Sequence, residues 1–190
     1  MIKYLEWDSK FFNLKIGKAE ISFLTPPLFN ELIEHKIYGK YDLVYLFVER
    51  IEDETLIELD KKRIFPYDEK VIYSKKVNTQ TSIPENINSY NGSLFPSLLN
   101  LTLLSGHKSR FKKDNRLNHK FEELYKKWIQ KSLSGEMADA VFVAKSEDKI
   151  EGFVTIKKKN QDGEIGLIAV DSATQGKGLG SKLLQAADYW

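Results

Sequence analysis

Hydrophobic residues in the second half of the chain recur first at helical spacing. Apolar side chains three or four positions apart fall on one face of an α-helix, which then packs against a core. The residues that follow this pattern are Leu117, Phe121, Leu124, Tyr125, Trp128 and Ile129. The pattern therefore predicts an amphipathic helix, and Gly135 just beyond it is a residue type that ends helices.

The pattern then changes to short β-rich segments separated by turn residues. The expected strands cover 140–144, 150–156 and 164–170. We expect a first turn at 147–149 and a hairpin turn at Asp162-Gly163, because Asp-Gly favours tight hairpins. After residue 170 a glycine-rich turn leads into a helix over 181–190, with Leu183, Leu184 and Ala187 on one face. Together these signals predict an antiparallel three-stranded meander, a loop and a helix.

The first half reads as shorter alternating elements. Helices are expected over 27–33 and 53–59, and strands over 41–48 and 70–74. The stretch after Asn78 is rich in Asn, Ser, Thr, Gln and Pro, a composition typical of connecting segments. We therefore expect an N-terminal αβ module at 1–78, a linker at 79–92 and a second domain at 93–190, in an α+β fold.

The amino-acid composition argues against several classes of function. Hydrophobic residues make up 42% of the 190 residues, which is enough for a packed core. The net charge is +2, so we expect no general electrostatic affinity for nucleic acid. The chain has no cysteine and 3 histidines, which argues against thiolate chemistry and a metal site. No segment is apolar enough to span a bilayer, and no secretory signal is visible.

The clearest candidate for a binding site is a glycine-rich turn, Gln175-Gly176-Lys177-Gly178-Leu179-Gly180. A strand that runs into glycines and a helix start gathers free backbone N–H groups, and the helix dipole adds positive potential there, so the turn favours phosphate. The spacing fits neither a P-loop nor a dinucleotide-binding fingerprint: Gly178 follows Lys177, and the preceding strand closes an antiparallel meander. A glycine-rich turn without a ligand is the alternative.

The turn also fits the pattern Gln/Arg-x-x-Gly-x-Gly/Ala, and here it resembles the pyrophosphate loop of the GCN5-related N-acetyltransferases (GNAT). The segment Ile165–Asp171 looks like the fourth strand of that family, whose backbone pairs with the pantetheine arm. The resemblance implies a GNAT-like fold and acetyl-CoA as acyl donor, without a metal. The residues that it assigns to the cofactor are Ile168, Ala169, Val170, Gln175, Gly176, Lys177, Gly178, Leu179, Gly180 and Ser181.

A narrower resemblance covers most of the chain. Leu5–Phe12, Ser109-Arg110-Phe111, Leu124–Ile129 and Gly152-Phe153-Val154 look like segments of the dTDP-fucosamine (dTDP-4-amino-4,6-dideoxygalactose) acetyltransferases. The resemblance implies acetyl transfer to the amine of a nucleotide-linked amino sugar, in cytoplasmic synthesis of surface polysaccharide. Two alternatives stay open: another amine acceptor, such as a protein N-terminus, a polyamine or an antibiotic, and a binding module that lacks catalysis.

Two further residues are candidates for the chemistry. Glu164 begins the last expected strand, where several acetyltransferases carry a catalytic glutamate, and it could remove the proton of the attacking amine. Arg110 lies in a basic stretch and has the fork geometry that suits a nucleotide diphosphate. The competing interpretations are a solvent-facing strand residue for Glu164 and a solvated loop for Arg110.

The family resemblance also implies a fifth strand and a tyrosine acid after the loop helix. Tyr189 does not match that tyrosine position. We therefore expect the chain to be either a piece of a longer enzyme or a product that has lost this part. An unpaired strand at 164–170 would expose N–H and C=O groups, so self-association through this open sheet edge is a further expectation.

Overall fold

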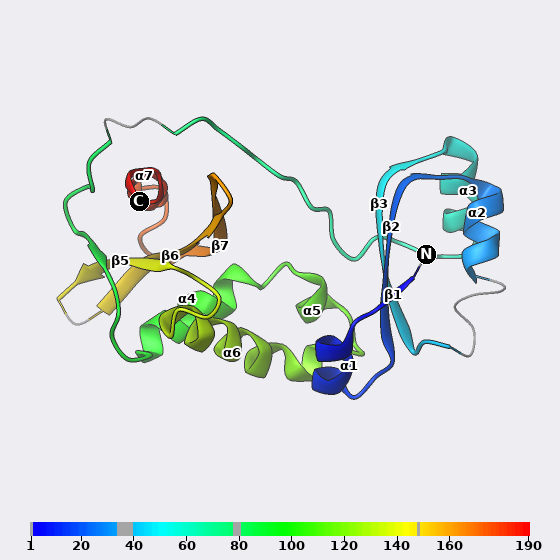
Figure 1. Cartoon of the computed structure of the whole chain (residues 1–190), viewed down its shortest axis with the longest axis horizontal. Coiled ribbons are helices and arrows are strands. Elements are labelled where there is room, and N and C mark those ends of the chain that lie inside the picture. The colour runs from blue at the N-terminus through cyan, green and yellow to red at the C-terminus, as the bar shows by residue number, and fades with distance from the viewer. Residues whose placement is uncertain (1, 34–39, 78–80, 148) are drawn as a thin grey trace. The chain divides into compact units, whose positions relative to one another are not determined.

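The computed structural model describes residues 2–33, 40–77, 81–147 and 149–190. Two compact units divide the chain, Met1–Pro66 and Tyr67–Trp190 (Figure 1). The sequence pattern places the end of the first module later, at residue 78. Residues 67–77 belong with the second unit because they are bonded to it: the Lys113 ammonium donates to the Tyr67 carbonyl at 2.9 Å, and Lys75 pairs with Asp188.

The first unit is a small three-stranded sheet with helices. Its elements are β1 (Lys3–Tyr4), α1 (Glu6–Phe12), β2 (Ile16–Leu24), α2 (Pro26–Glu31), β3 (Leu43–Ile51) and α3 (Asp53–Lys61). The strand order is β1-β2-β3, with β1 antiparallel and β3 parallel to β2. Leu24, Phe29 and Leu32 form its buried cluster, against which Val48 and Leu59 pack. The αβ module expected in this part of the chain is therefore present.

The second unit holds an antiparallel sheet in the order β4-β5-β6-β7. Its strands are β4 (Ile87–Ser89), β5 (Ala140–Ser146), β6 (Lys149–Lys159) and β7 (Asp162–Val170). Its helices are α4 (Pro96–Ser105), α5 (Arg110–Lys113), α6 (Phe121–Leu133) and α7 (Leu179–Tyr189), with a 3₁₀ turn, η2, at Asn118–Lys120. The predicted helix, meander, loop and C-terminal helix are confirmed, as is the α+β class.

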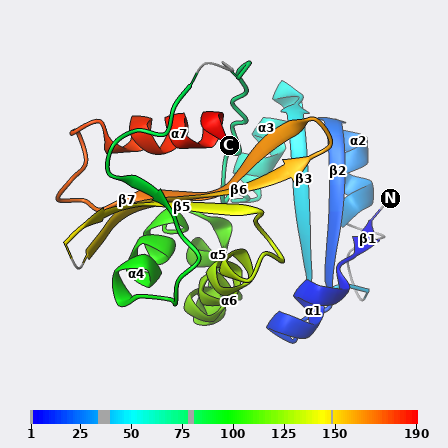
Figure 2. The same ribbon diagram turned by 60° about the vertical axis from the view of Figure 1, so that its left-hand side comes forward.

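Helices cover both faces of this sheet (Figure 2). On one face Leu183 and Ala186 of α7 pack against Phe142 and Val154. On the other face Leu98 of α4 and Ile129 of α6 pack against Val143 and Phe153. Neighbouring strand residues point to opposite faces, so β5 and β6 must be apolar on both faces, which is why they read as continuous hydrophobic runs.

Two local expectations were wrong. Residues 70–74 form no strand, since these β-prone side chains are exposed (77% for Ile72 and 89% for Tyr73) and have no ladder partner. The β6–β7 turn lies at Asn160-Gln161, because cross-strand pairing of Lys159 with Asp162 puts Asp162-Gly163 inside β7. Asn160 has φ +59°, a conformation that asparagine tolerates well.

The expected linker 79–92 also contains a strand. Ile87 pairs with Ala144 and is buried in the cluster under α7. Three residues in a polar stretch carry too weak a pattern to be recognised as a strand, but the neighbouring β5 supplies the hydrogen-bond partners. Part of the segment taken as a linker therefore belongs to the second sheet.

Candidate functional site

The loop between β7 and α7 is organised by Asp171. Its carbonyl accepts hydrogen bonds from the backbone N–H groups of Thr174 at 2.9 Å and Gln175 at 3.1 Å, and its carboxylate accepts one from Ala173 at 2.9 Å. The Gln175 amide reaches back to the Val170 carbonyl at 3.1 Å. The loop thus closes as a tight turn directly after the strand, and the chain leaves it toward the start of α7.

The Asp171 carboxylate is also tied to β6. The Lys149 ammonium lies 2.6 Å from it, and this hydrogen bond, with that of the Ala173 N–H, holds the pKa of Asp171 below its ordinary value. The same contact raises the pKa of Lys149. Both partners stay charged near neutral pH, so the base of the loop keeps its conformation across the physiological range.

Two glycines give the second half of the loop its shape. Gly176 and Gly178 both have φ +79°, a left-handed conformation that non-glycine residues adopt at a cost. No atom lies within 4 Å of the position that a Cβ would take at either residue. Gly178 is the N-cap of α7, and no side chain caps that end of the helix. The backbone is therefore open to an approaching ligand at both positions.

Free hydrogen-bond donors gather at this point. Within the described residues, no acceptor receives a hydrogen bond from the backbone N–H groups of Gly176 through Ser181. The first N–H groups of any helix lack an intrahelical partner, and the dipole of α7 adds positive potential there. Successive N–H groups of this kind form a binding site for a phosphate or diphosphate.

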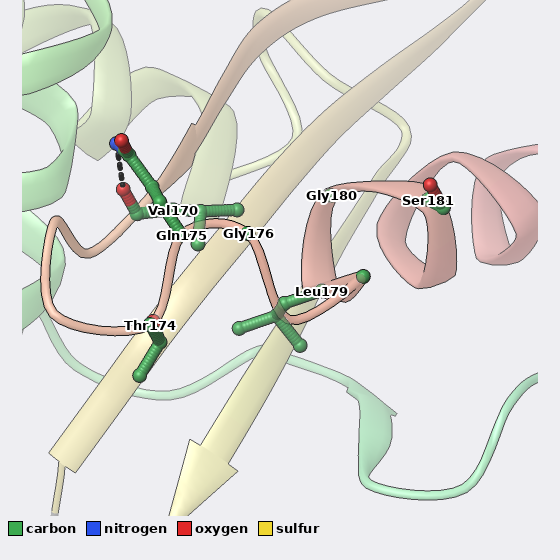
Figure 3. Close-up of a pocket in the computed structure, with 8 residues that line it drawn as sticks. Val170, Thr174, Gln175, Gly176, Leu179, Gly180 and Ser181 are labelled. Atoms are coloured by element: carbon green, nitrogen blue, oxygen red, sulfur yellow. Dashed lines mark hydrogen bonds between the residues drawn. The ribbon is translucent and has the colours of Figure 1, made fainter.

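The loop and the start of α7 line an open surface cavity of about 310 Å³ (Figure 3). Val170, Thr174 and Gln175 form one part of its lining, and Gly176 and Gly178–Ser181 form the rest. Of the predicted cofactor residues, Lys177 is outside this lining. Ile168 and Ala169 lie in β7 and pack on opposite faces of the sheet. Sequence reasoning missed Thr174 and the structural role of Asp171, because the signal Asp-x-x-Thr is short and common.

Glu164 lies at the other end of β7. It pairs with Lys157 across the ladder, is exposed (62% for its side chain), and its carboxylate lies 3.6 Å from the Lys159 ammonium. Glu164 is six residues before Val170, which is about 20 Å along an extended strand. Glu164 does not lie beside the loop. A catalytic role for Glu164 therefore requires a ligand that extends from the loop along β7 to this residue.

Arg110 begins α5, on the face of the sheet opposite to α7. Phe111 packs edge-on against Trp128 of α6, with ring centroids 5.6 Å apart. The Arg110 guanidinium carbon lies 4.2 Å from the centroid of the Phe111 ring, a cation–π contact. Burial raises the pKa of Tyr125, and the Ser109 hydroxyl and the Arg110 charge oppose that rise. These residues form a cluster of aromatic and polar side chains on α5 and α6, and none of them lines the glycine loop.

In the part of the chain that the structure describes, no group of three or more His, Asp or Glu side chains is arranged to hold a metal ion. No helix among the same residues has the length and apolar character needed to cross a bilayer.

Comparison with known proteins finds a family to which part of the second unit is similar. Residues 138–190, which span β5 to α7, match the family described as Acetyltransferase (GNAT) domain. The match covers less than a third of the chain and supports a GNAT-type acetyltransferase domain in this segment. The α+β architecture is consistent with an acyl-CoA N-acyltransferase fold.

The other comparisons add little. No curated protein matches the chain. Among solved structures, the crystal structure of PH1933 from Pyrococcus horikoshii OT3 has 28% sequence identity, over 53% of this chain and 68% of that one. Its TM-score is 0.39, which is too low to bear on the fold.

Proposed function

We propose that this protein transfers the acetyl group of acetyl-CoA to the amine of a nucleotide-linked amino sugar, a step in cytoplasmic polysaccharide synthesis. The observation that carries the proposal is the row of free N–H groups at Gly176–Ser181, within the residues that match the GNAT domain. A pyrophosphate bound there receives backbone hydrogen bonds and the favourable potential of the α7 dipole. The open Cβ positions at Gly176 and Gly178 leave room for its oxygens.

The pantetheine arm then follows β7. This strand is at the edge of the described sheet, so one row of its backbone N–H and C=O groups faces away from β6. The arm contains two amide groups, which can bond to such an edge as a short strand would. From the loop this path leads along β7 toward Glu164.

Acetyl transfer requires one proton to leave the amine and one to reach the sulfur. The amine nitrogen attacks the thioester carbonyl carbon, the C–N bond forms, the C–S bond breaks, and the thiolate takes up a proton. Glu164 is the candidate base at the far end of β7. Because its carboxylate is exposed and beside Lys159, it would act through water, and the ion pair would have to open.

The acceptor class rests on the resemblance to the dTDP-fucosamine acetyltransferases and on Arg110. The Phe111 ring restrains the Arg110 guanidinium, and a restrained guanidinium loses less conformational entropy when it binds a diphosphate with two parallel hydrogen bonds. The α5 segment also contains Lys112 and Lys113, so its local charge is positive. A nucleotide diphosphate is the ligand that fits these features.

The test is a thiol-release assay with acetyl-CoA and a panel of amines. The chain has no cysteine, so all thiol that reacts with a disulfide reagent comes from the reaction. We expect turnover with dTDP-4-amino-4,6-dideoxygalactose and at most weak turnover with polyamines, peptide N-termini or aminoglycosides. If only one of those amines is acetylated, that amine replaces the nucleotide amino sugar as the proposed acceptor. Tight CoA binding without turnover of any amine would favour a binding module.

Arg110 is tested by substitution in the same assay. Arg110→Gln should raise KM for the nucleotide amino sugar about tenfold, because losing a charge-assisted contact costs roughly 1.4 kcal/mol. Lys112→Gln, which removes a charge from the same helix, is the matched control and should change KM less than twofold. Equal effects of the two variants would contradict a specific contact of Arg110.

A further inference from the structure

The segment that begins the second unit, residues 67–77, is a strap anchored near both ends. Near its start, the Lys113 ammonium of α5 donates to the Tyr67 carbonyl at 2.9 Å. Near its end, Lys75 pairs with Asp188 at the C-terminal end of α7 (Figure 2). No hydrogen bond joins the residues between these anchors to any other described residue. The strap therefore runs from α5 to α7, two helices on opposite faces of the sheet, and its middle is open to solvent.

The middle of the strap presents apolar side chains to water. Val71, Ile72 and Tyr73 are 59%, 77% and 89% exposed. These residue types favour extended structure, yet no strand of either described sheet pairs with them. Adjacent large apolar side chains that the core leaves uncovered are typical of contact surfaces for a ligand or partner. The middle of the strap is therefore a candidate contact surface.

The start of the strap lies beside the cluster on α5 and α6 that contains Arg110. Burial raises the pKa of Tyr125, the charge of Asp68 adds to this rise, and the charge of Arg110 opposes it. The strap residue Asp68 and the guanidinium of Arg110 thus act on the same phenol group. A diphosphate bound to Arg110 would lie next to the start of the strap.

The second anchor of the strap lies near the proposed reaction centre. Asp188 is two residues after Ala186, which belongs to the same buried cluster as Ile156. Ile156 pairs with Ile165 across the β6–β7 ladder, and Ile165 follows Glu164 in the chain. The C-terminal part of α7 therefore packs over the end of the sheet at which acyl transfer is proposed.

A nucleotide amino sugar bound as proposed runs between the same two points as the strap, with its diphosphate at Arg110 and its amine near Glu164. We infer that the strap forms part of the acceptor site and that the ring of Tyr73 packs on the sugar of the acceptor. Tyr73 is the most exposed of the three apolar residues and the nearest in sequence to the second anchor. This inference rests on the proposed function, because it requires the acceptor to bind between Arg110 and β7.

The chemistry of a tyrosine suits a deoxy sugar. The face of an aromatic ring is electron-rich and attracts the C–H groups that such a sugar presents. The phenol hydroxyl can also donate to or accept from a sugar hydroxyl. Contact with the sugar would cover an apolar ring that water now surrounds, which is favourable.

The test uses calorimetric affinities of the full chain, saturated with CoA, for dTDP-4-amino-4,6-dideoxygalactose and for dTDP, which lacks the sugar. Tyr73→Ala should lower the affinity for the nucleotide sugar at least fivefold and change the affinity for dTDP less than twofold. Tyr73→Phe keeps the ring and should keep both affinities within twofold of the wild-type values. Val77→Ala truncates an exposed apolar residue beyond the second anchor, and as the matched control it should change neither affinity by twofold.

A Tyr73→Ala variant with the wild-type affinity for the nucleotide sugar would overturn the inference, as would an equal loss of affinity for both ligands. Because the Tyr73 side chain is exposed, its truncation should leave the thermal unfolding midpoint unchanged, so a loss of affinity would not report misfolding. If the wild-type chain binds CoA but not the nucleotide sugar, the proposed acceptor fails and the inference fails with it. If it binds both and only the Tyr73→Ala result is negative, the role of the strap alone is rejected.

Trypsin cleavage gives a second readout that needs no substitution. Lys70 and Lys76 flank the middle of the strap and are exposed, so trypsin can cleave after both. The nucleotide sugar should slow this cleavage at least threefold, and dTDP should slow it less. Equal rates with the two ligands would contradict a contact between the strap and the sugar.

Discussion

Gly178 adopts a left-handed backbone conformation and also leaves space for a ligand, and a larger side chain would prevent both. Its φ of +79° starts α7, and the space beside it belongs to the cavity of the loop. A β-branched residue in the left-handed region costs about 1–3 kcal/mol, and its side chain would fill space that a ligand needs. The loop and the helix start therefore depend on glycine at this position.

Gly178→Val should weaken CoA binding at least tenfold, measured by calorimetry on protein whose thermal unfolding shows that it is folded. Gly178→Asn is the matched control, because asparagine tolerates the left-handed conformation, and it should lose less affinity than valine. Unchanged CoA affinity in the valine variant would contradict the assignment of the loop.

Asp114 is the most enclosed carboxylate with a defined partner among the described residues. Its side chain is 6% exposed and accepts hydrogen bonds from the Arg116 backbone N–H and Nε at 2.9 Å and from Nη2 at 2.6 Å. These bonds hold the pKa of Asp114 below its ordinary value of 3.8. The stabilisation is thus present above the unfolded-state pKa and is lost as the pH falls through the lower folded-state pKa.

Asp114→Asn should lower the free energy of unfolding by about 1.5–3 kcal/mol at pH 7, the usual range for hydrogen bonds to charged groups. The difference from wild type should shrink as the pH falls below about 4, which urea denaturation between pH 7 and pH 3 would detect. Glu136→Gln removes an exposed carboxylate that pairs with Lys131 and should have little effect. A difference that is constant with pH would contradict this account.

At the scale of elements, the position of α7 depends on Gly152 in β6. A Cβ at Gly152 would lie 3.0 Å from Leu183 Cδ1, 3.3 Å from the Ala169 carbonyl oxygen and 3.4 Å from Leu179 Cδ2. The helix that carries the loop therefore rests directly on the backbone of β6. A side chain at this position would push α7 and the N–H groups at its start away from the sheet.

Gly152→Val should destabilise the protein by about 1–3 kcal/mol, the usual cost of overpacking, and should weaken CoA binding with it. Gly163→Val is the matched control in the same hairpin, because no atom lies within 4 Å of its Cβ position. Urea midpoints and CoA affinities of the two variants provide the comparison. Equal stability of both variants would show that α7 does not depend on this close approach.

At the scale of the whole molecule, the free edge of β7 is open to another strand as well as to a ligand. Ile165 is partly exposed in this edge strand, and the part of β7 from Ile165 to Val170 has no charged residue or proline to discourage pairing between chains. We expect the protein to self-associate through β7, and we expect saturating CoA to shift it toward the monomer, because both compete for the same backbone groups.

Sedimentation velocity over a concentration series tests this expectation. Ile165→Lys adds a charge to the edge and should favour the monomer, whereas Ile72→Lys, at an exposed position outside both sheets, should not. A wild-type chain that stays monomeric at every concentration, or equal effects of the two lysine variants, would contradict self-association at β7.

The sequence determined the parts of this protein that depend on neighbouring residues. Helical spacing, strand alternation and glycines before a helix start are local signals, so α6, the β5–β7 meander, the glycine loop and α7 were predictable. The free N–H groups of the loop were predictable for the same reason, because they follow from backbone geometry at a helix start.

Only the tertiary structure decided the features that join distant residues. β4 exists because β5 offers Ile87 a partner, and the β6–β7 turn lies at Asn160-Gln161 because cross-strand pairing sets its register. The ion pair of Lys149 with Asp171 and the bond from Leu167 to Thr155 also depend on that register. Such contacts are selected by the packing of whole strands and helices, and a pattern of single residues along the chain does not contain that information.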